Sequence, residues 1–118
     1  MKGDDLANWL LDFAVRIIGI SAALAKSQAG RHIAGQVVEA ATSVGAHYEE
    51  ARGAESKADF VHKLGVAPKE CRETQYWLKV VHRAKLLSGD FPADPLVEAD
   101  ELCAILGRSI LTSKGRSK

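Results

Sequence analysis

Residues 6–24 read LANWLLDFAVRIIGISAAL, and this stretch decides the fold class. Its large apolar side chains recur at alternating spacings of four and three residues, which places them on one face of a helix. They are Leu6, Leu10, Phe13, Ile17, Ile20 and Leu24. Leu11, Ala14 and Ile18 widen that stripe, so we expect this helix to contact neighbours on more than one side. The pattern predicts a helix over residues 5–25 in a packed helical protein.

The flanks of this helix argue against a membrane span or a secretory signal. Asp4 and Asp5 precede it, where a signal peptide carries positive charge. Asp12 and Arg16 interrupt the apolar run, and their spacing of four residues allows them to pair on one helix face. A span needs about 20 residues that are predominantly apolar. We therefore predict no membrane association.

A second helix is predicted over residues 28–52, with Ser27 as its N-cap and Gly53 at its end. Its apolar positions repeat the same pattern. Gly35 and Gly45 lie in its interior, where glycine costs roughly 0.5 to 1 kcal/mol relative to alanine. They indicate either close approach by another backbone or glycines that the helix merely tolerates.

A third helix is predicted over residues 57–88. Ser56 and Asp59 have the spacing of a capping box ahead of it. Its core positions are Phe60, Leu64, Ala67, Cys71, Thr74, Leu78 and Val81. Pro68 lies inside this helix, and we expect a kink there and not an end, because the apolar repeat continues in register.

A fourth helix is predicted over residues 95–112, because Asp94 followed by Pro95 is a strong start signal. The chain of 118 residues is long enough for one core and is interpreted as one domain over residues 1–118. Four amphipathic segments with short connections predict an all-α protein, an antiparallel up-down-up-down four-helix bundle.

Charge and cysteine usage limit the function classes. Sixteen basic and fifteen acidic residues give a net charge of +1, so the chain lacks the strong basic excess of a simple nucleic-acid binder. This net charge does not exclude a basic surface on one side of the protein. Cys71 and Cys103 form no metal-binding motif and fall at apolar positions of their helices. They are interpreted as reduced core thiols of a cytoplasmic protein.

Residues 47–63 read HYEEARGAESKADFVHK and concentrate acidic residues and histidines. Di-iron bundles use Glu-x-x-His on each of two helices. The nearest match here is Asp59 with His62, no second copy exists, and capping explains Asp59 without a metal. No nucleophile motif or phosphate-binding loop occurs either. We predict no metal, no cofactor, no small-molecule substrate and no enzymatic activity.

The third helix carries a cationic row with one aromatic residue in it. Its spacings of three, four, three and four place the row within an arc of about 80°, opposite the core stripe. It consists of Lys69, Arg72, Tyr76, Lys79 and Arg83. The row suits phosphates and a stacked base, so it is a candidate RNA-binding surface. The alternative is an ordinary solvated face, in which Glu73 neutralises Lys69.

Two tryptophans favour self-association. Trp9 lies at the edge of the first apolar stripe, and Trp77 lies between the core and the cationic row. Large aromatic residues in such positions indicate partly covered surfaces. With the wide apolar face of the first helix, they predict a homo-oligomer.

Three segments carry a resemblance to a known family: TSVGAHYEEA at 42–51, ESKADFVHKL at 55–64 and YWL at 76–78. In these the chain resembles the four-helix-bundle proteins encoded in intervening sequences of bacterial 23S rRNA genes. The resemblance implies an antiparallel bundle that assembles into a homopentamer, a cytoplasmic location and no known enzymatic activity. The accessory variability protein of diversity-generating retroelements is a more distant relative, similar in fold, that binds nucleic acid and a reverse transcriptase.

Two functional hypotheses follow. The first is a non-catalytic oligomeric bundle that binds RNA or a nucleoprotein through basic faces repeated by symmetry. The second is a protein-interaction scaffold that has no nucleic-acid role and docks a partner on its exposed aromatic residues.

Overall fold

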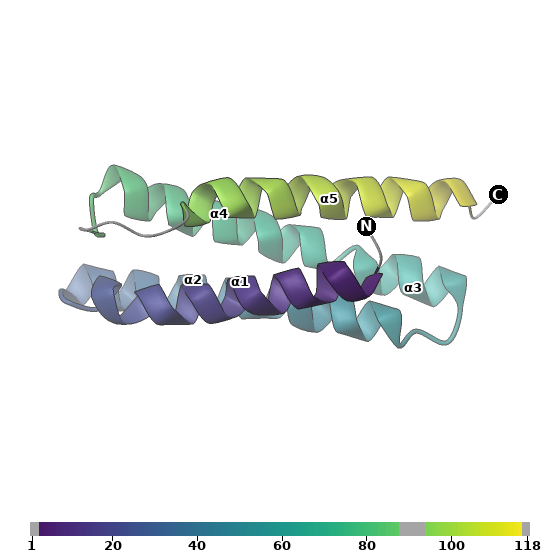
Figure 1. Cartoon of the computed structure of the whole chain (residues 1–118), viewed down its shortest axis with the longest axis horizontal. Helices are drawn as coiled ribbons and strands as arrows, with labels where there is room; N and C mark the ends of the chain where they lie inside the picture. Colours follow the sequence, from purple (N-terminus) through teal and green to yellow (C-terminus); the bar gives the residue numbers. More distant parts are fainter. Residues whose placement is uncertain (1–2, 88–93, 117–118) are drawn as a thin grey trace.

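The computed structural model describes residues 3–87 and 94–116, with side chains described as far as residue 112. The elements in chain order are α1 (Gly3–Leu24), α2 (Gln28–Arg52), α3 (Lys57–Leu64), α4 (Ala67–Arg83) and α5 (Pro95–Arg116). Figure 1 shows α1 and α2 along one side of an antiparallel bundle and α4 and α5 along the other, with the start of α1 and the end of α5 both toward the right of the view. The predicted all-α four-helix bundle is confirmed, with α3 and α4 together in the place of the predicted third helix.

The predicted apolar stripe of α1 lies in the core. Each of its six side chains is no more than 8% exposed, and Phe13 and Ile17 are fully enclosed. By length and composition alone α1 also qualifies as a membrane span. In the bundle, however, its stripe packs against α2. Burial of this stripe is therefore the main force that holds α1 in place.

The two interior glycines of α2 have different surroundings. A Cβ atom at Gly45 would lie 3.5 Å from the Cβ atom of Leu10, with the Leu10 backbone just beyond. Helix α1 therefore passes beside Gly45, but an added Cβ atom would meet it only at ordinary contact distances. Gly35 has open space around it, so there glycine is only tolerated.

A tight turn joins α1 to α2. The Ser27 hydroxyl accepts a hydrogen bond of 3.0 Å from the N–H of Gly30, which confirms the predicted N-cap. A Cβ atom at Gly30 would lie 1.8 Å from the carbonyl oxygen of Leu24. Any side chain at residue 30 would therefore force the end of α1 away from the start of α2.

At the start of α3 the Ser56 half of the predicted capping box is confirmed, whereas the Asp59 carboxylate bonds to the N–H of Glu55 and not to that of Ser56. The Ser56 hydroxyl accepts the N–H of Asp59 at 3.1 Å, and the Asp59 carboxylate accepts the N–H of Glu55 at 3.3 Å. Asp94 also acts as predicted, because its carboxylate accepts the N–H of Leu96 at 2.9 Å in the first turn of α5. Local signals thus set the starts of α2, α3 and α5.

The prediction of one continuous, kinked helix over 57–88 is wrong. The helix ends at Leu64 and a new helix begins at Ala67, while Gly65 and Val66 keep right-handed helical backbone angles. The N–H of Val66 bonds to the carbonyl of Lys63, the tighter three-residue spacing that is common at helix ends. Pro68 has no N–H and lies in the first turn of α4, where none is needed.

The end of α4 also differs from the prediction, because the helix stops at Arg83. Lys85 has a positive φ of 53°. The N–H of Leu86 returns to the carbonyl of Val81 and the N–H of Lys85 to that of His82. This is a Schellman motif, which satisfies free carbonyls and turns the chain out of the helix. Residue 88 lies outside the described residues.

The cysteine prediction is corrected by the structure. Cys71 on α4 and Cys103 on α5 form a disulfide instead of remaining reduced thiols. Their Cα atoms are 5.7 Å apart, within the range that a disulfide requires. The two residues lie on facing sides of neighbouring helices but are 32 positions apart in sequence, so no local spacing indicated the pair.

A polar contact joins α1 to the first turn of α5. The Glu98 carboxylate accepts the Trp9 indole N–H at 2.8 Å and the Arg16 Nε–H at 3.0 Å, and a second Arg16 nitrogen also bonds to it. Arg16 thus reaches across to α5 and not to Asp12, the neighbour suggested by sequence spacing. The Glu98 side chain is only 15% exposed, so these bonds compensate for its burial.

Candidate nucleic-acid interface

The five residues of the predicted cationic row all lie exposed on α4. We call this surface the basic ridge; it consists of Lys69, Arg72, Tyr76, Lys79 and Arg83. On the opposite side of the same helix, Cys71, Thr74, Leu78 and Val81 are buried. From Lys69 to Arg83 the ridge is about 20 Å long at 1.5 Å per residue. The helical period therefore separates a solvent-facing cationic edge from a core-facing apolar one.

The C-terminal half of the ridge borders a shallow hollow of about 490 Å³. Tyr76, Lys79 and Arg83 line it together with Val80 and Ala84. An aromatic ring, small apolar groups and two cations thus surround one concave surface. A nucleobase can stack on the tyrosine there, while the cations reach phosphates on either side.

The four cations of the ridge are available for a ligand. Among the ion pairs between described side chains, none includes Lys69, Arg72, Lys79 or Arg83. In particular, the Lys69–Glu73 pair that their spacing allows is not formed. Beside α4, Asp100 of α5 accepts a 2.8 Å hydrogen bond from Gln75.

Trp77 connects the ridge helix to α2. Its ring meets the edge of Tyr76 at a centroid distance of 5.1 Å and the ring of His32, on α2, at 6.1 Å. Trp77 is half-buried against the core. Trp77 therefore packs beside Tyr76 and supports its ring. Because Trp77 is half-buried, it is not itself part of the exposed ridge.

The polar cluster at residues 47–63 serves the junction between α2 and α3. Ser56 caps α3, and the Asp59 carboxylate accepts the N–H of Glu55 and pairs with Lys63 at 3.2 Å. The ammonium of Lys63 holds the pKa of the Asp59 carboxyl below its usual range. His62 is exposed. Over the described part of the chain, no three His, Cys, Asp or Glu side chains come together as metal ligands.

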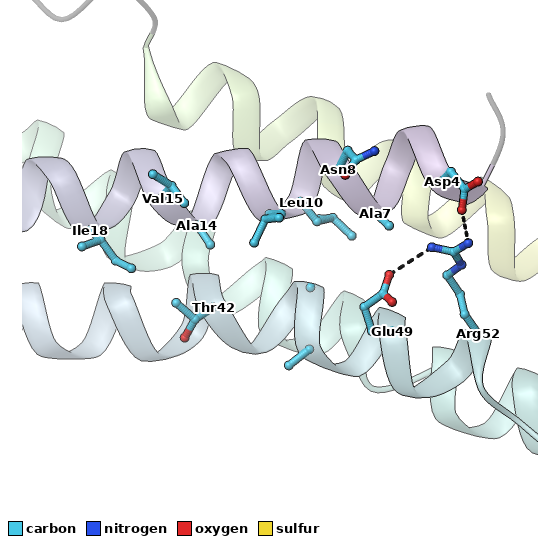
Figure 2. A pocket seen from close by; sticks show the side chains of 13 residues that line it. Asp4, Ala7, Asn8, Leu10, Ala14, Val15, Ile18, Thr42, Glu49 and Arg52 are labelled. Atoms are coloured by element: carbon cyan, nitrogen blue, oxygen red, sulfur yellow. Dashed lines mark hydrogen bonds and ion pairs between the residues drawn. The ribbon is translucent and has the colours of Figure 1, made fainter.

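A groove between α1 and α2 was not identified as a site from the sequence. This α1–α2 groove has a volume of about 730 Å³. Figure 2 shows Val15 and Ile18 along its α1 side and Thr42 and Glu49 along its α2 side. Leu11, Val15 and Ile18 are 61%, 59% and 51% exposed. The widened apolar face of the first helix was the sequence signal for this surface.

One end of the α1–α2 groove is charged. Arg52 of α2 pairs with Glu49 at 3.1 Å and also with Asp4 of α1 (Figure 2). The two carboxylates and one guanidinium leave this end with a net charge of −1. The groove is therefore apolar along its length and acidic at one end.

These features define a helical-bundle protein whose candidate sites are a cationic surface and an apolar groove. A family model described as the 23S rRNA-intervening sequence protein matches residues 6–108. The chain belongs to this family. It is also similar to a crystal structure of a protein of unknown function from the S23 ribosomal protein family of Bacteroides thetaiotaomicron. The two are 33% identical, with a TM-score of 0.82 over 93% of this chain and 98% of that one. A comparison with curated proteins finds no match.

Proposed function

We propose that this protein is a non-catalytic, self-assembling helical bundle that binds RNA or a nucleoprotein through the basic ridge. The observation that supports this most is the set of four cations without intramolecular ion pairs among the described side chains, arranged around Tyr76 and its hollow. Phosphate contacts supply most of the affinity of such surfaces, and an aromatic ring adds stacking to an unpaired base.

Self-assembly is the second part of this proposal. One ridge of four cations binds weakly by itself. The family resemblance implies a homopentamer. Such an oligomer presents several ridges at fixed positions, and simultaneous contacts with one RNA raise the overall affinity. The exposed apolar side chains of α1 support self-assembly, because a contiguous apolar surface of this kind is commonly an interface. The same proposal involves no membrane, cofactor or small-molecule substrate. The cytoplasmic location rests on the family resemblance alone, because the Cys71–Cys103 disulfide removes the argument from reduced thiols.

The ridge can be tested with a fluorescent RNA hairpin that has an unpaired loop. The double variant Lys79→Glu with Arg83→Glu removes both cations of the hollow. We expect it to weaken binding by roughly tenfold or more, because both phosphate contacts become repulsive. The matched control is Lys26→Glu with Lys57→Glu, which makes the same charge change at exposed positions outside the ridge. Equal affinity of both variants and the parent protein would overturn the ridge assignment.

The α1–α2 groove favours a second candidate function, a protein-interaction scaffold without nucleic-acid binding. This alternative predicts that a tagged protein retains one stoichiometric protein partner and no RNA after washing at high salt. Retention of RNA by the parent protein but not by the ridge variant would exclude it.

A further inference from the structure

Two exposed rings from different helices flank Trp77. Tyr76 belongs to the basic ridge on α4, and His32 belongs to α2. Trp77 meets both rings edge-on, at centroid distances of 5.1 Å to Tyr76 and 6.1 Å to His32. The Tyr76 and His32 centroids are therefore no further apart than the sum of these distances. The aromatic surface thus continues from the ridge across the junction between α4 and α2.

An apolar strip of α4 borders these rings. Val80 lies four residues after Tyr76 and three after Trp77, so it shares a helix face with each of them. Val80 and Ala84 line the hollow beside Tyr76. Exposed rings next to small apolar side chains form a surface that suits the flat faces of unpaired nucleobases.

The distribution of charge shows which part of this surface an RNA strand can cross. Among the ion pairs between described side chains, none includes His32. Glu73 lies one turn before Trp77 on α4, and Glu39 lies two turns after His32 on α2. Because α2 and α4 run antiparallel (Figure 1), both carboxylates lie on the same side of the three rings, away from the cations of the hollow. Phosphates are therefore attracted to the end of the bundle where α4 ends and α2 begins.

We infer that the ligand is single-stranded RNA, which crosses from the basic ridge onto α2 and stacks one unpaired base on Tyr76 and a nearby base on His32. The inference rests on the proposed RNA binding and names the class of RNA and a binding residue outside the ridge. Lys79 and Arg83 contact the phosphates of the same strand. In a duplex the bases are paired and stacked on one another, so neither ring has a base face to contact.

A comparison of a strand with its duplex tests the class of RNA. The probes are a fluorescent RNA strand without internal pairing and the same strand annealed to its complement. A surface that binds by charge alone binds the duplex at least as tightly, because the duplex has the higher density of phosphates. With bases stacked on both rings, we expect the single strand to bind roughly tenfold more tightly. Equal or tighter binding of the duplex overturns the inference.

Variants of His32 test the ring on α2. His32→Ala is expected to weaken binding of the single strand by roughly tenfold and to leave binding of the duplex unchanged, because only a stacking surface is lost. His32→Phe keeps a flat ring and is expected to retain the preference for the single strand. His62→Ala, at an exposed histidine on α3, is the matched control and keeps the parent affinity for both probes. Both histidines are exposed, so circular dichroism is expected to show an unchanged fold in all three variants.

The outcomes separate this inference from the proposed function. A parent protein that binds neither probe overturns the proposed RNA binding together with the inference. If the parent binds the strand and loses affinity with Lys79→Glu and Arg83→Glu but not with His32→Ala, the ridge stands and the inference alone is overturned. A His32→Phe variant that binds the strand as weakly as His32→Ala also overturns it, because a ring at residue 32 then does not support a base.

Discussion

The α1–α2 side and the α4–α5 side of the bundle are held together by different interactions. α1 packs on α2 along its length, with a continuous stripe of apolar side chains from Leu6 to Leu24 buried. The described side chains of α5 contribute only three fully buried residues: Ala99, Leu102 and Leu106. The Cys71–Cys103 bond, the contacts of Glu98 and the Gln75–Asp100 hydrogen bond add specific attachments, and Leu96, Ile105 and Ile110 pack partly buried against the core.

This difference indicates how each side responds to damage. Hydrophobic burial on the α1–α2 side is spread over many residues. Each large side chain contributes to the free energy of unfolding, and loss of one leaves the other contacts between the helices in place. Attachment of α5 is concentrated at a few specific contacts. Breaking one of those contacts is therefore expected to loosen α5 selectively.

The largest effect is expected from the core of the α1–α2 side. Phe13→Ala removes a fully buried ring and leaves a cavity, so we expect the free energy of unfolding to fall by about 3 to 5 kcal/mol. Urea denaturation at fixed protein concentration measures this value. Asp12→Ala, the exposed neighbour, is the control and is expected to change stability by less than about 0.5 kcal/mol. A decrease below about 1 kcal/mol for Phe13→Ala would show that α1 is not the centre of the core.

The next effect comes from the disulfide on the α4–α5 side. The bond joins residues 32 positions apart, and removal of that constraint is expected to cost about 3 to 4 kcal/mol in the chain-entropy account. Thermal unfolding with and without a reducing agent measures this cost. Amide hydrogen exchange is expected to rise in α5 before it rises in α1. The double variant Cys71→Ala with Cys103→Ala serves as the control, because the reductant then has no bond to break. An unchanged melting temperature on reduction of the parent protein would contradict the role given to this bond.

The smallest effect is expected at the end of α4. Lys85 has a left-handed backbone conformation, which is unfavourable for a residue with a Cβ atom. Lys85→Gly is therefore expected to raise the free energy of unfolding by about 1 kcal/mol. Ala84→Gly, one residue earlier and in a right-handed conformation, is expected to lower it by roughly 0.5 to 1 kcal/mol. If both variants were destabilising, the Schellman motif would not be what ends α4.

The sequence predicted those features that depend on nearby residues. Periodicity indicated the buried stripe of α1 and the exposure of the basic ridge, because both follow from the helical repeat. Capping signals at Ser27, Ser56 and Asp94 indicated the helix starts. Each of these interactions joins residues no more than a few positions apart, which is why a single sequence contains the information.

Features that depend on tertiary packing were missed. The disulfide joins helices far apart in sequence, and Arg16 pairs with Glu98 and not with its neighbour on the same helix. The end of α4 was also missed, because a lysine takes the place at which glycine is usual. The α1–α2 groove arises only when two helices with a wide apolar face and small residues pack side by side.

The salt dependence of RNA binding tests the central claim most directly. The logarithm of the association constant for the RNA hairpin, plotted against the logarithm of salt concentration, reports the number of phosphates that the protein neutralises. We predict that Lys79→Glu with Arg83→Glu reduces the magnitude of this slope by about 2, or about 1 for each cation removed. The control with Lys26→Glu and Lys57→Glu keeps the parent slope. Identical slopes for all three proteins, or no binding by the parent at low salt, would contradict the proposed role of the ridge.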